Sequence, residues 1–146
     1  MLLTGLLDED LTWLGTIGDR ADYLPGTVLI ADGAEQADFF ILLSGRAAVV
    51  GAGAVLAHLE PGDVAGEISL IDGLAASATV MLTTSGQVMR VQRAPLLARL
   101  ESGDGFAFRF HRAVTKILAA RLRGSNRRAS SAEVETQRVI THFKAA

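Results

Sequence analysis

Turn-forming residues divide the middle of the chain into short segments. Between Ala21 and Val91, apolar runs alternate with pairs of turn-forming residues about every 8 to 12 positions. These pairs are Pro25-Gly26, Asp32-Gly33, Ser44-Gly45 and Pro61-Gly62. This spacing accommodates strands joined by tight turns, but not the helices that connect parallel strands. The sequence therefore predicts a mainly β fold of antiparallel strands, a jelly roll or β-roll.

Helices are predicted on both sides of these strands. The strands are expected over residues 22–24, 27–31, 39–43, 46–50, 55–59, 78–82 and 87–91. An N-terminal helix over 9–17, capped by Asp8, precedes them, and a short helix over 96–100, opened by Pro95, follows them. A long C-terminal helix then carries an apolar stripe at steps of three and four residues. The stripe consists of Phe106, Phe110, Ala113, Val114, Ile117, Leu118 and Leu122.

The long helix and the residues after it set the domain organisation. We expect one domain over 1–123, and a helical C-terminal extension over 124–146 whose last helix covers 132–143. The 23 residues after Arg123 are too few for a helix-turn-helix with its own core, so no DNA-binding domain is expected. The apolar stripe either closes the subunit's own sheet or pairs with a second copy. Both roles are compatible if Phe106 and Phe110 face the sheet and 117–122 faces the partner.

The net charge of −2 hides two oppositely charged halves. Up to Met89 the chain has twelve acidic residues and only two arginines, which gives a net charge of −10. From Arg90 onward it has twelve lysines and arginines and four acidic residues, which gives +8. A basic half suits nucleic acid or an anionic membrane, but equally the acidic half of the same protein or of a twin subunit. Because the pI is near 5.9, we favour pairing within the protein or between subunits.

Several functional classes lack their sequence signatures. The chain has no cysteine, which excludes disulfides, thiolate metal sites and cysteine nucleophiles. His58, His111 and His142 are scattered without metal-site spacing, and Ser44 lacks the setting of a nucleophile elbow. We therefore expect neither an enzyme nor a metal-binding protein. The apolar runs are too short for a transmembrane segment and the N-terminus is a poor secretory signal, which predicts a cytoplasmic protein.

The stretch 66–80 has the features of an anion-binding loop. Gly66 precedes a short apolar helix that a second glycine ends, and a loop then leads into a strand. The first amides of such a helix have no partner inside it and point, with the positive end of the helix dipole, at whatever lies in front. Glu67 can accept a hydrogen bond from a hydroxyl near the anion, and Ser77 and Thr79 add hydroxyl groups. These groups suit a small molecule that carries both a phosphate and a sugar hydroxyl.

This stretch resembles the phosphate-binding cassette of cyclic-nucleotide-binding domains, as in catabolite-activator-type regulators and the regulatory subunits of cyclic-nucleotide-dependent kinases. Gly66-Glu67-Ile68-Ser69-Leu70 and Ser77-Ala78-Thr79-Val80 match the cassette position for position. Further turns and strands of the family are resembled by residues 25–29, 32–33, 39–45 and 59–63. The likeness covers about residues 9–123 and implies the β-roll of that family.

The resemblance also implies a ligand site. In the family, the glutamate matching Glu67 binds the ribose 2′-hydroxyl, while the amides of the glycine loop and the serine matching Ser77 hold the phosphate. Alternatively, Glu67 is an acidic helix cap and the loop is simply a tight turn. The family's phosphate-binding arginine is absent, since Ala75-Ala76 stand where the cassette has Pro-Arg. The implied ligand-binding residues are Gly66, Glu67, Ile68, Ser69, Ala76, Ser77, Ala78 and Thr79.

The C-terminal helix supplies the candidates for a lid over this site. Arg121 or Arg123 can reach inward and replace the missing cation, or remain solvated at the surface. Ser125 and Asn126 stand where the family's C-terminal helix reaches the base, but beside Gly124 they are equally compatible with a helix stop.

These observations lead to a functional expectation with one alternative. We expect a cytoplasmic regulatory homodimer that binds cAMP, cGMP or another phosphate ligand and signals to a partner protein through its C-terminal helix. The alternative is a degenerate cyclic-nucleotide-binding fold that has no ligand and serves as a dimerisation or protein-docking module.

Overall fold

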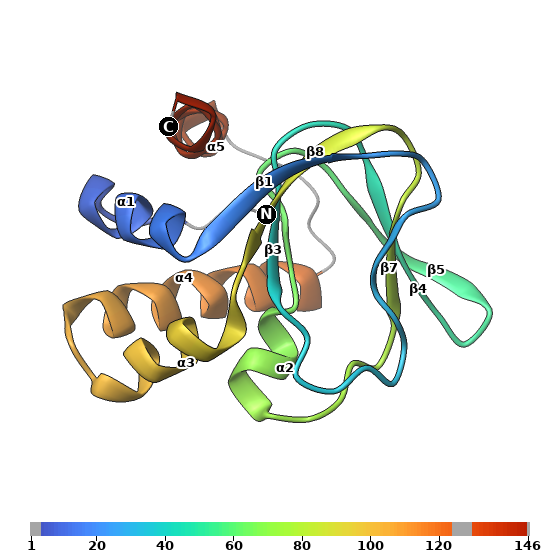
Figure 1. Ribbon diagram of the computed structural model, residues 1–146, viewed down its shortest axis with the longest axis horizontal. Helices are drawn as coiled ribbons and strands as arrows, with labels where there is room; N and C mark the ends of the chain where they lie inside the picture. Colours follow the sequence, from blue (N-terminus) through green and yellow to red (C-terminus); the bar gives the residue numbers. More distant parts are fainter. Residues whose placement is uncertain (1–3, 124–129, 146) are drawn as a thin grey trace.

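The computed structural model describes residues 4–123 and 130–145 (Figure 1). The start of the expected C-terminal extension, including Ser125 and Asn126, lies outside the described residues. In chain order the elements are α1 (Asp8–Thr16), β1 (Gly18–Tyr23), β2 (Val28–Ile30), β3 (Phe39–Leu42), β4 (Ala47–Gly51), β5 (Ala54–Leu59), β6 (Val64–Ala65), α2 (Glu67–Asp72), β7 (Thr79–Leu82), β8 (Gly86–Val91), α3 (Arg93–Ser102), α4 (Gly105–Leu122) and α5 (Ser130–Ala145).

The strands form two four-stranded sheets. One sheet has the order β1-β8-β3-β6 and the other the order β2-β7-β4-β5. All neighbouring strands in both sheets are antiparallel. The predicted antiparallel β-roll with an N-terminal helix and a long C-terminal helix is therefore confirmed. Strand β6 was not predicted, because its two residues are too few to give a periodic pattern.

Strand β3 lies between the two halves of the core. All four of its residues are buried. Phe39 and Ile41 belong to the cluster that includes the helices, where the ring of Phe39 meets that of Phe110 edge-on at 5.5 Å. Phe40 and Leu42 belong to the cluster between the two sheets. Because successive side chains of a strand point to opposite faces, β3 contributes to both clusters.

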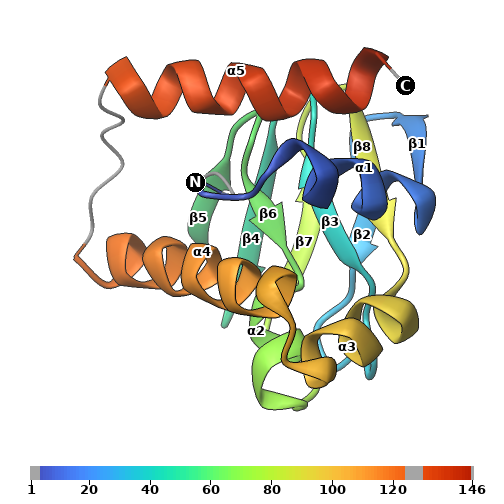
Figure 2. The ribbon, with the colours of Figure 1, turned by 90° about the vertical axis from the view of Figure 1, so that its left-hand side faces the viewer.

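Helices α1, α4 and α5 are among those that pack against the sheet that contains β3. In Figures 1 and 2, α1 lies between α4 and α5, and α4 and α5 run near opposite ends of the strands. Helix α4 buries Phe106, Phe110 and Ile117, while α5 buries Val139 and Phe143. Within the described residues, none of the helices has the length and apolar character that crossing a membrane requires.

The start of α1 differs from the expected cap. Leu7, not Asp8, occupies the N-cap position, so the prediction for Asp8 was wrong. The carboxylate of Asp10 instead accepts a hydrogen bond of 2.8 Å from the amide of Leu7. Asp8 is the first helical residue and pairs with Arg138 of α5. Position alone could not predict this exchange, because three consecutive acidic residues can each reach the first amides of the helix.

The outer face of α4 is smaller than expected. Ile117 is fully buried in the subunit's own core, so its predicted place at a partner interface was wrong. Leu122 and Phe108 are 89% and 68% exposed, respectively. The apolar surface that α4 leaves open therefore lies at its two ends.

Ion pairs join the acidic and basic halves of the chain. Four arginines of the basic half pair with carboxylates of the acidic half. These pairs are Arg90–Asp38, Arg109–Asp10, Arg121–Glu67 and Arg138–Asp8. The favoured pairing within the protein is thus observed, and it consumes part of the positive charge of the C-terminal half.

Candidate functional site

Gly66 fixes the loop that leads into α2. Its φ of 90° lies in the left-handed region, and an added Cβ would come within 3.0 Å of the carbonyl oxygen of Asp38. Both conditions require glycine at this position. The first hydrogen bond of the helix joins the Leu70 amide to the Gly66 carbonyl at 3.2 Å. The amides of residues 67–69 precede that bond and so have no partner within the helix.

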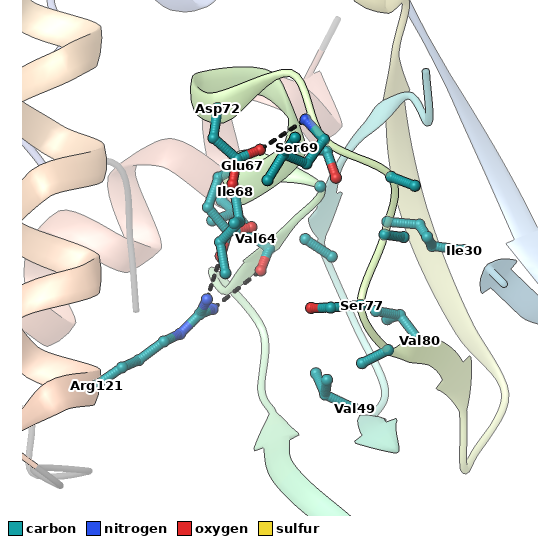
Figure 3. Close-up of a pocket in the computed structure, with 16 residues that line it drawn as sticks. Ile30, Val49, Val64, Glu67, Ile68, Ser69, Asp72, Ser77, Val80 and Arg121 are labelled. Carbon is teal, nitrogen blue, oxygen red and sulfur yellow. Dashed lines mark hydrogen bonds and ion pairs between the residues drawn. The ribbon is translucent and has the colours of Figure 1, made fainter. Parts of the chain in front are cut away.

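A cavity of about 360 Å³ opens in front of this loop (Figure 3). A volume in this range suits a small-molecule ligand. One wall comes from β6 and α2, a second from the loop before β7, a third from β2, β4 and β7, and Arg121 reaches in from α4. The lining residues are Ile30, Val49, Val64, Ala65, Gly66, Glu67, Ile68, Ser69, Asp72, Leu74, Ala75, Ala76, Ser77, Ala78, Val80 and Arg121.

Arg121 and Glu67 form an ion pair at the edge of this cavity. The side chain of Glu67 is only 3% exposed, whereas that of Arg121 is 31% exposed. Arg121 Nη1 donates to Glu67 Oε1, and Nη2 donates to the carbonyl oxygen of Val64 at 3.1 Å. Figure 3 shows the guanidinium extending from α4 to these two acceptors. The last turn of α4 is thereby connected to both β6 and α2.

The charge of the lining is slightly negative. Glu67 and Asp72 contribute two carboxylates, and Arg121 contributes the only cation among the described lining residues. That cation is already paired with Glu67. An anionic ligand must therefore rely on the amides of residues 67–69, on hydroxyl groups such as that of Ser77, and on Arg121 shared with Glu67.

The structure brings most of the predicted site residues together. Seven of the eight cassette residues, from Gly66 to Ser69 and from Ala76 to Ala78, line the cavity, as does Arg121. Thr79 is not among the lining residues, and its hydroxyl accepts a hydrogen bond of 3.1 Å from the amide of Asp32. Arg123 is exposed and is also absent from the lining. Ser125 and Asn126 lie outside the described residues.

Sequence reasoning missed the apolar wall of the cavity. Ile30, Val49 and Val80 come from three strands of one sheet, and Val49 lies opposite Val80 in the β4–β7 register. Strand alternation would have placed them on one face, but not the strand order that makes them neighbours. Asp72 and Leu74 were also missed. The part of the chain that the structure describes contains no group of three histidine, aspartate or glutamate side chains arranged for a metal ion.

Comparisons with known proteins agree with this geometry. The sequence matches the profile of the family described as "Cyclic nucleotide-binding domain" over residues 20–102. No curated protein matches it.

Solved structures share the fold. A putative cyclic nucleotide-binding protein from Geobacter metallireducens GS-15 has a TM-score of 0.73 at 21% identity, covering 81% of this chain and 89% of that one. The catabolite activator protein of Thermus thermophilus has a TM-score of 0.68 at 24% identity, covering 84% and 58%. The regulatory subunit of a cAMP-independent protein kinase A from Trypanosoma brucei has 0.59 at 23%, covering 72% and 42%. Since the family profile covers more than half of the 146 residues, the chain belongs to the cyclic-nucleotide-binding domain family.

Proposed function

We propose that this chain is a regulatory ligand-sensing domain that binds a cyclic nucleotide, cAMP or cGMP, or a related phosphate compound. The observation that carries the proposal is the convergence of three kinds of group on one cavity. Glu67, Ile68, Ser69 and Ser77, which carry a carboxylate, helix-terminal amides and a hydroxyl, all line it. We further propose that the domain is not catalytic, acts in the cytoplasm as a homodimer and signals to a partner protein through its C-terminal helix.

Each group has a distinct role in this proposal. The carboxylate of Glu67 accepts the ribose hydroxyl, while the amides of residues 67–69 and the hydroxyl of Ser77 donate to the phosphate. The apolar wall of Ile30, Val49 and Val80 packs against the sugar and base. Arg121 supplies positive charge from α4, so that bound phosphate contacts both the β-roll and the C-terminal helix.

The absence of the cassette arginine lowers the expected affinity. Ala76 lines the cavity where the family places that arginine. One hydrogen bond to a charged group contributes about 1.5–3 kcal/mol, which corresponds to roughly ten- to more than a hundredfold in affinity. We therefore propose binding that is weaker than in relatives that retain the arginine. One solved relative is the regulatory subunit of a cAMP-independent kinase, so the fold alone does not fix the ligand as cAMP.

A second function is favoured by the ion pair itself. Arg121 already pairs with Glu67, so this buried carboxylate has its counter-charge without a ligand. On this alternative the fold is a dimerisation or docking module, and the cavity is a remnant.

Isothermal calorimetry with cAMP and cGMP separates the two functions. Saturable heat at micromolar nucleotide supports the sensor. If the wild-type protein gives no heat but Ala76→Arg does, the cavity is a remnant that lacks only its cation. Ala98→Arg, at an exposed position on α3, is the matched control for an added surface charge. If neither the wild type nor Ala76→Arg gives heat, only the function as a dimerisation or docking module remains.

A further inference from the structure

Asp38, the residue before β3, contacts three other parts of the fold. Its carboxylate accepts a hydrogen bond of 2.7 Å from Arg90 Nε of β8 and one of 3.0 Å from the amide of Arg93, the first residue of α3. The N-cap residue of α3, Gln92, makes no side-chain capping bond, so Asp38 caps this helix from a distant part of the chain. The carbonyl oxygen of Asp38 lies behind Gly66, where an added Cβ would come within 3.0 Å of it.

Arg93 extends from the start of α3 to α2. Its Nη2 donates to the carbonyl oxygen of Ser69 at 3.3 Å, and the same oxygen accepts from the amide of Gly73 at 2.9 Å, where α2 ends. Figures 1 and 2 show α3 beside α2. A guanidinium next to the carbonyls that end a helix is favourable because it faces the negative end of the helix dipole. Since α2 has only six residues, it depends on such tertiary contacts more than a long helix does.

These two contacts enclose the part of α2 that forms a wall of the cavity. Asp38 lies against the turn at Gly66, and Arg93 holds the helix at Ser69, three positions later. Glu67 stands between these two points and lines the cavity. Asp38 and Arg93 themselves do not line it, so any effect that they have on a ligand passes through α2.

Arg93 is only partly satisfied in this position. Its Nη1 is buried and has no hydrogen-bond partner among the residues that the structure describes. A buried donor without a partner opposes folding, so the guanidinium adds little to the stability of the whole domain. The carbonyl of Ser69 keeps its bond from Gly73 when Arg93 is removed. Loss of the guanidinium is therefore expected to loosen α2 while leaving the unfolding free energy of the domain almost unchanged.

We propose that Arg93 and Asp38 are positioning residues of the candidate ligand site. Arg93 holds α2 so that Glu67 keeps its place at the cavity, and Asp38 fixes the start of α3, from which the Arg93 side chain extends. The inference deepens the proposed function, and it rests on that function only for the claim that a ligand engages Glu67. How α2 is held is a property of the ligand-free protein and can be measured there.

Amide hydrogen exchange, followed by NMR, tests the hold on α2 without a ligand. The amide of Leu70 is the reporter, because its bond of 3.2 Å to the Gly66 carbonyl is the first of the helix. Arg93→Met keeps the apolar stem of the side chain and removes the guanidinium. We expect exchange at Leu70 to become about fivefold faster, as the loss of one hydrogen bond implies.

A second amide separates this effect from unfolding of the whole domain. The amide of Leu82, in β7, donates to the Thr27 carbonyl at 2.9 Å and should exchange as in the wild type. Faster exchange at Leu70 but not at Leu82 supports the proposal, whereas equal acceleration at both amides, or at neither, overturns it. Arg46→Met, which removes an exposed arginine paired with Glu60, is the matched control for the lost charge and should leave both rates unchanged.

A double variant tests Asp38. Asp38→Ala removes the cap of α3 and is expected to speed exchange at Leu70. Added to Arg93→Met, it should speed that exchange no further, because Asp38 acts on α2 through the Arg93 side chain. Independent, multiplying effects of the two substitutions would overturn the role assigned to Asp38. Arg93→Lys, which keeps the charge and a donor, is expected to recover part of the loss.

Calorimetry with cAMP then relates the hold on α2 to binding. We expect Arg93→Met to weaken binding about fivefold, and Arg46→Met to bind as the wild type does, with urea unfolding unchanged in both variants. If the wild type binds cAMP and Arg93→Met binds it equally well, the positioning role is overturned while the proposed sensor stands. If the wild type gives no heat, the proposed function fails for this nucleotide, and the exchange rates at Leu70 alone decide whether Arg93 and Asp38 position α2.

Discussion

At the scale of single residues, Glu67 and Arg121 determine what the cavity can accept. A carboxylate that is 3% exposed is stable there because a guanidinium faces it. A ligand has to share or replace this cation. If the proposed ligand binds here, we expect its selectivity to depend on its hydroxyl groups as much as on its charge.

Glu67→Gln tests this dependence. The substitution keeps the shape of the side chain but removes the charge that strengthens a hydrogen bond to a ribose hydroxyl, so we expect cAMP affinity to fall about tenfold or more. 2′-Deoxy-cAMP lacks that hydroxyl, so its affinity should fall much less on the same substitution. Titration calorimetry of both nucleotides against both proteins gives the comparison. Equal losses for the two nucleotides would contradict the assigned role of Glu67.

Asp10 predicts a pH dependence of stability. Burial raises the pKa of this carboxyl, but the hydrogen bonds from Arg109 and from the Leu7 amide lower it more, so that the pKa lies below its usual 3.8. In the unfolded chain the carboxyl binds protons at its usual pKa, so acid favours unfolding. The stabilising contribution is complete above that value and is lost as the pH falls through the lowered pKa of the folded state.

We therefore expect Asp10→Asn to reduce the loss of unfolding free energy between about pH 6 and about pH 3. Urea titrations at the two pH values measure it. Some acid sensitivity should remain, because the pKa of Asp104 is also lowered, chiefly by the Ala107 amide and then by Arg99. Identical pH slopes in the wild type and in Asp10→Asn would show that this ion pair does not govern acid stability.

At the scale of elements, the turn before β6 contacts α5, and the sequence could not predict where this helix packs. Alternating strands and the apolar stripe of α4 were predictable because each follows its own period. The docking of α5 against Gly62 was not, since it depends on a contact between positions 74 residues apart. The apolar wall of the cavity was not predicted either, because its residues come from strands that are distant in sequence. The cassette was predicted because its groups are adjacent in the chain.

Gly62→Ala should expose this contact. At a φ of 94° an alanine costs about 1–2 kcal/mol from backbone strain alone. Gly26→Ala, at a φ of 85° with no atom within 4 Å of its new Cβ, carries the strain without the contact. We expect Gly62→Ala to lose about 1–3 kcal/mol more than Gly26→Ala, as measured by urea unfolding.

Thr136→Ser provides the rescue. It removes the Cγ2 methyl group that the new alanine would meet, so the double variant should recover part of the loss. Strict additivity of Gly62→Ala and Thr136→Ser would show that the two residues do not meet.

At the scale of the whole molecule, ion pairs join the two oppositely charged halves of the chain. Arg109 and Arg121 bind carboxylates of the acidic half from opposite ends of α4, and Arg138 does so from α5. Part of the positive charge of the basic half is thus paired within the protein, so the net charge of that half is not by itself an argument for a nucleic-acid site. The large apolar side chains that α4 exposes are Phe108 and Leu122, fourteen residues and therefore about four helical turns apart.

The proposed homodimer is expected to use these two positions. Leu122→Asp and Phe108→Asp should each shift the protein from dimer to monomer, because burying an unpaired carboxylate in an interface is costly. Leu24→Asp, which is 75% exposed on the turn after β1, is the control and should leave the dimer intact. Sedimentation velocity over a range of concentrations makes the comparison. A wild-type protein that is monomeric at every concentration would contradict the proposed homodimer.

The glycine at position 66 has a consequence for how this pocket can diversify. Its backbone conformation and the carbonyl of Asp38 behind it disfavour any larger residue, so the turn that leads into the amides of residues 67–69 depends on glycine at this position. Val49, Ala76 and Ser77 line the cavity on strand and loop backbone outside this turn, so substitutions there can change the lining without altering the glycine turn. Homologues with a different ligand specificity are therefore expected to differ at those three positions and to retain the glycine at position 66.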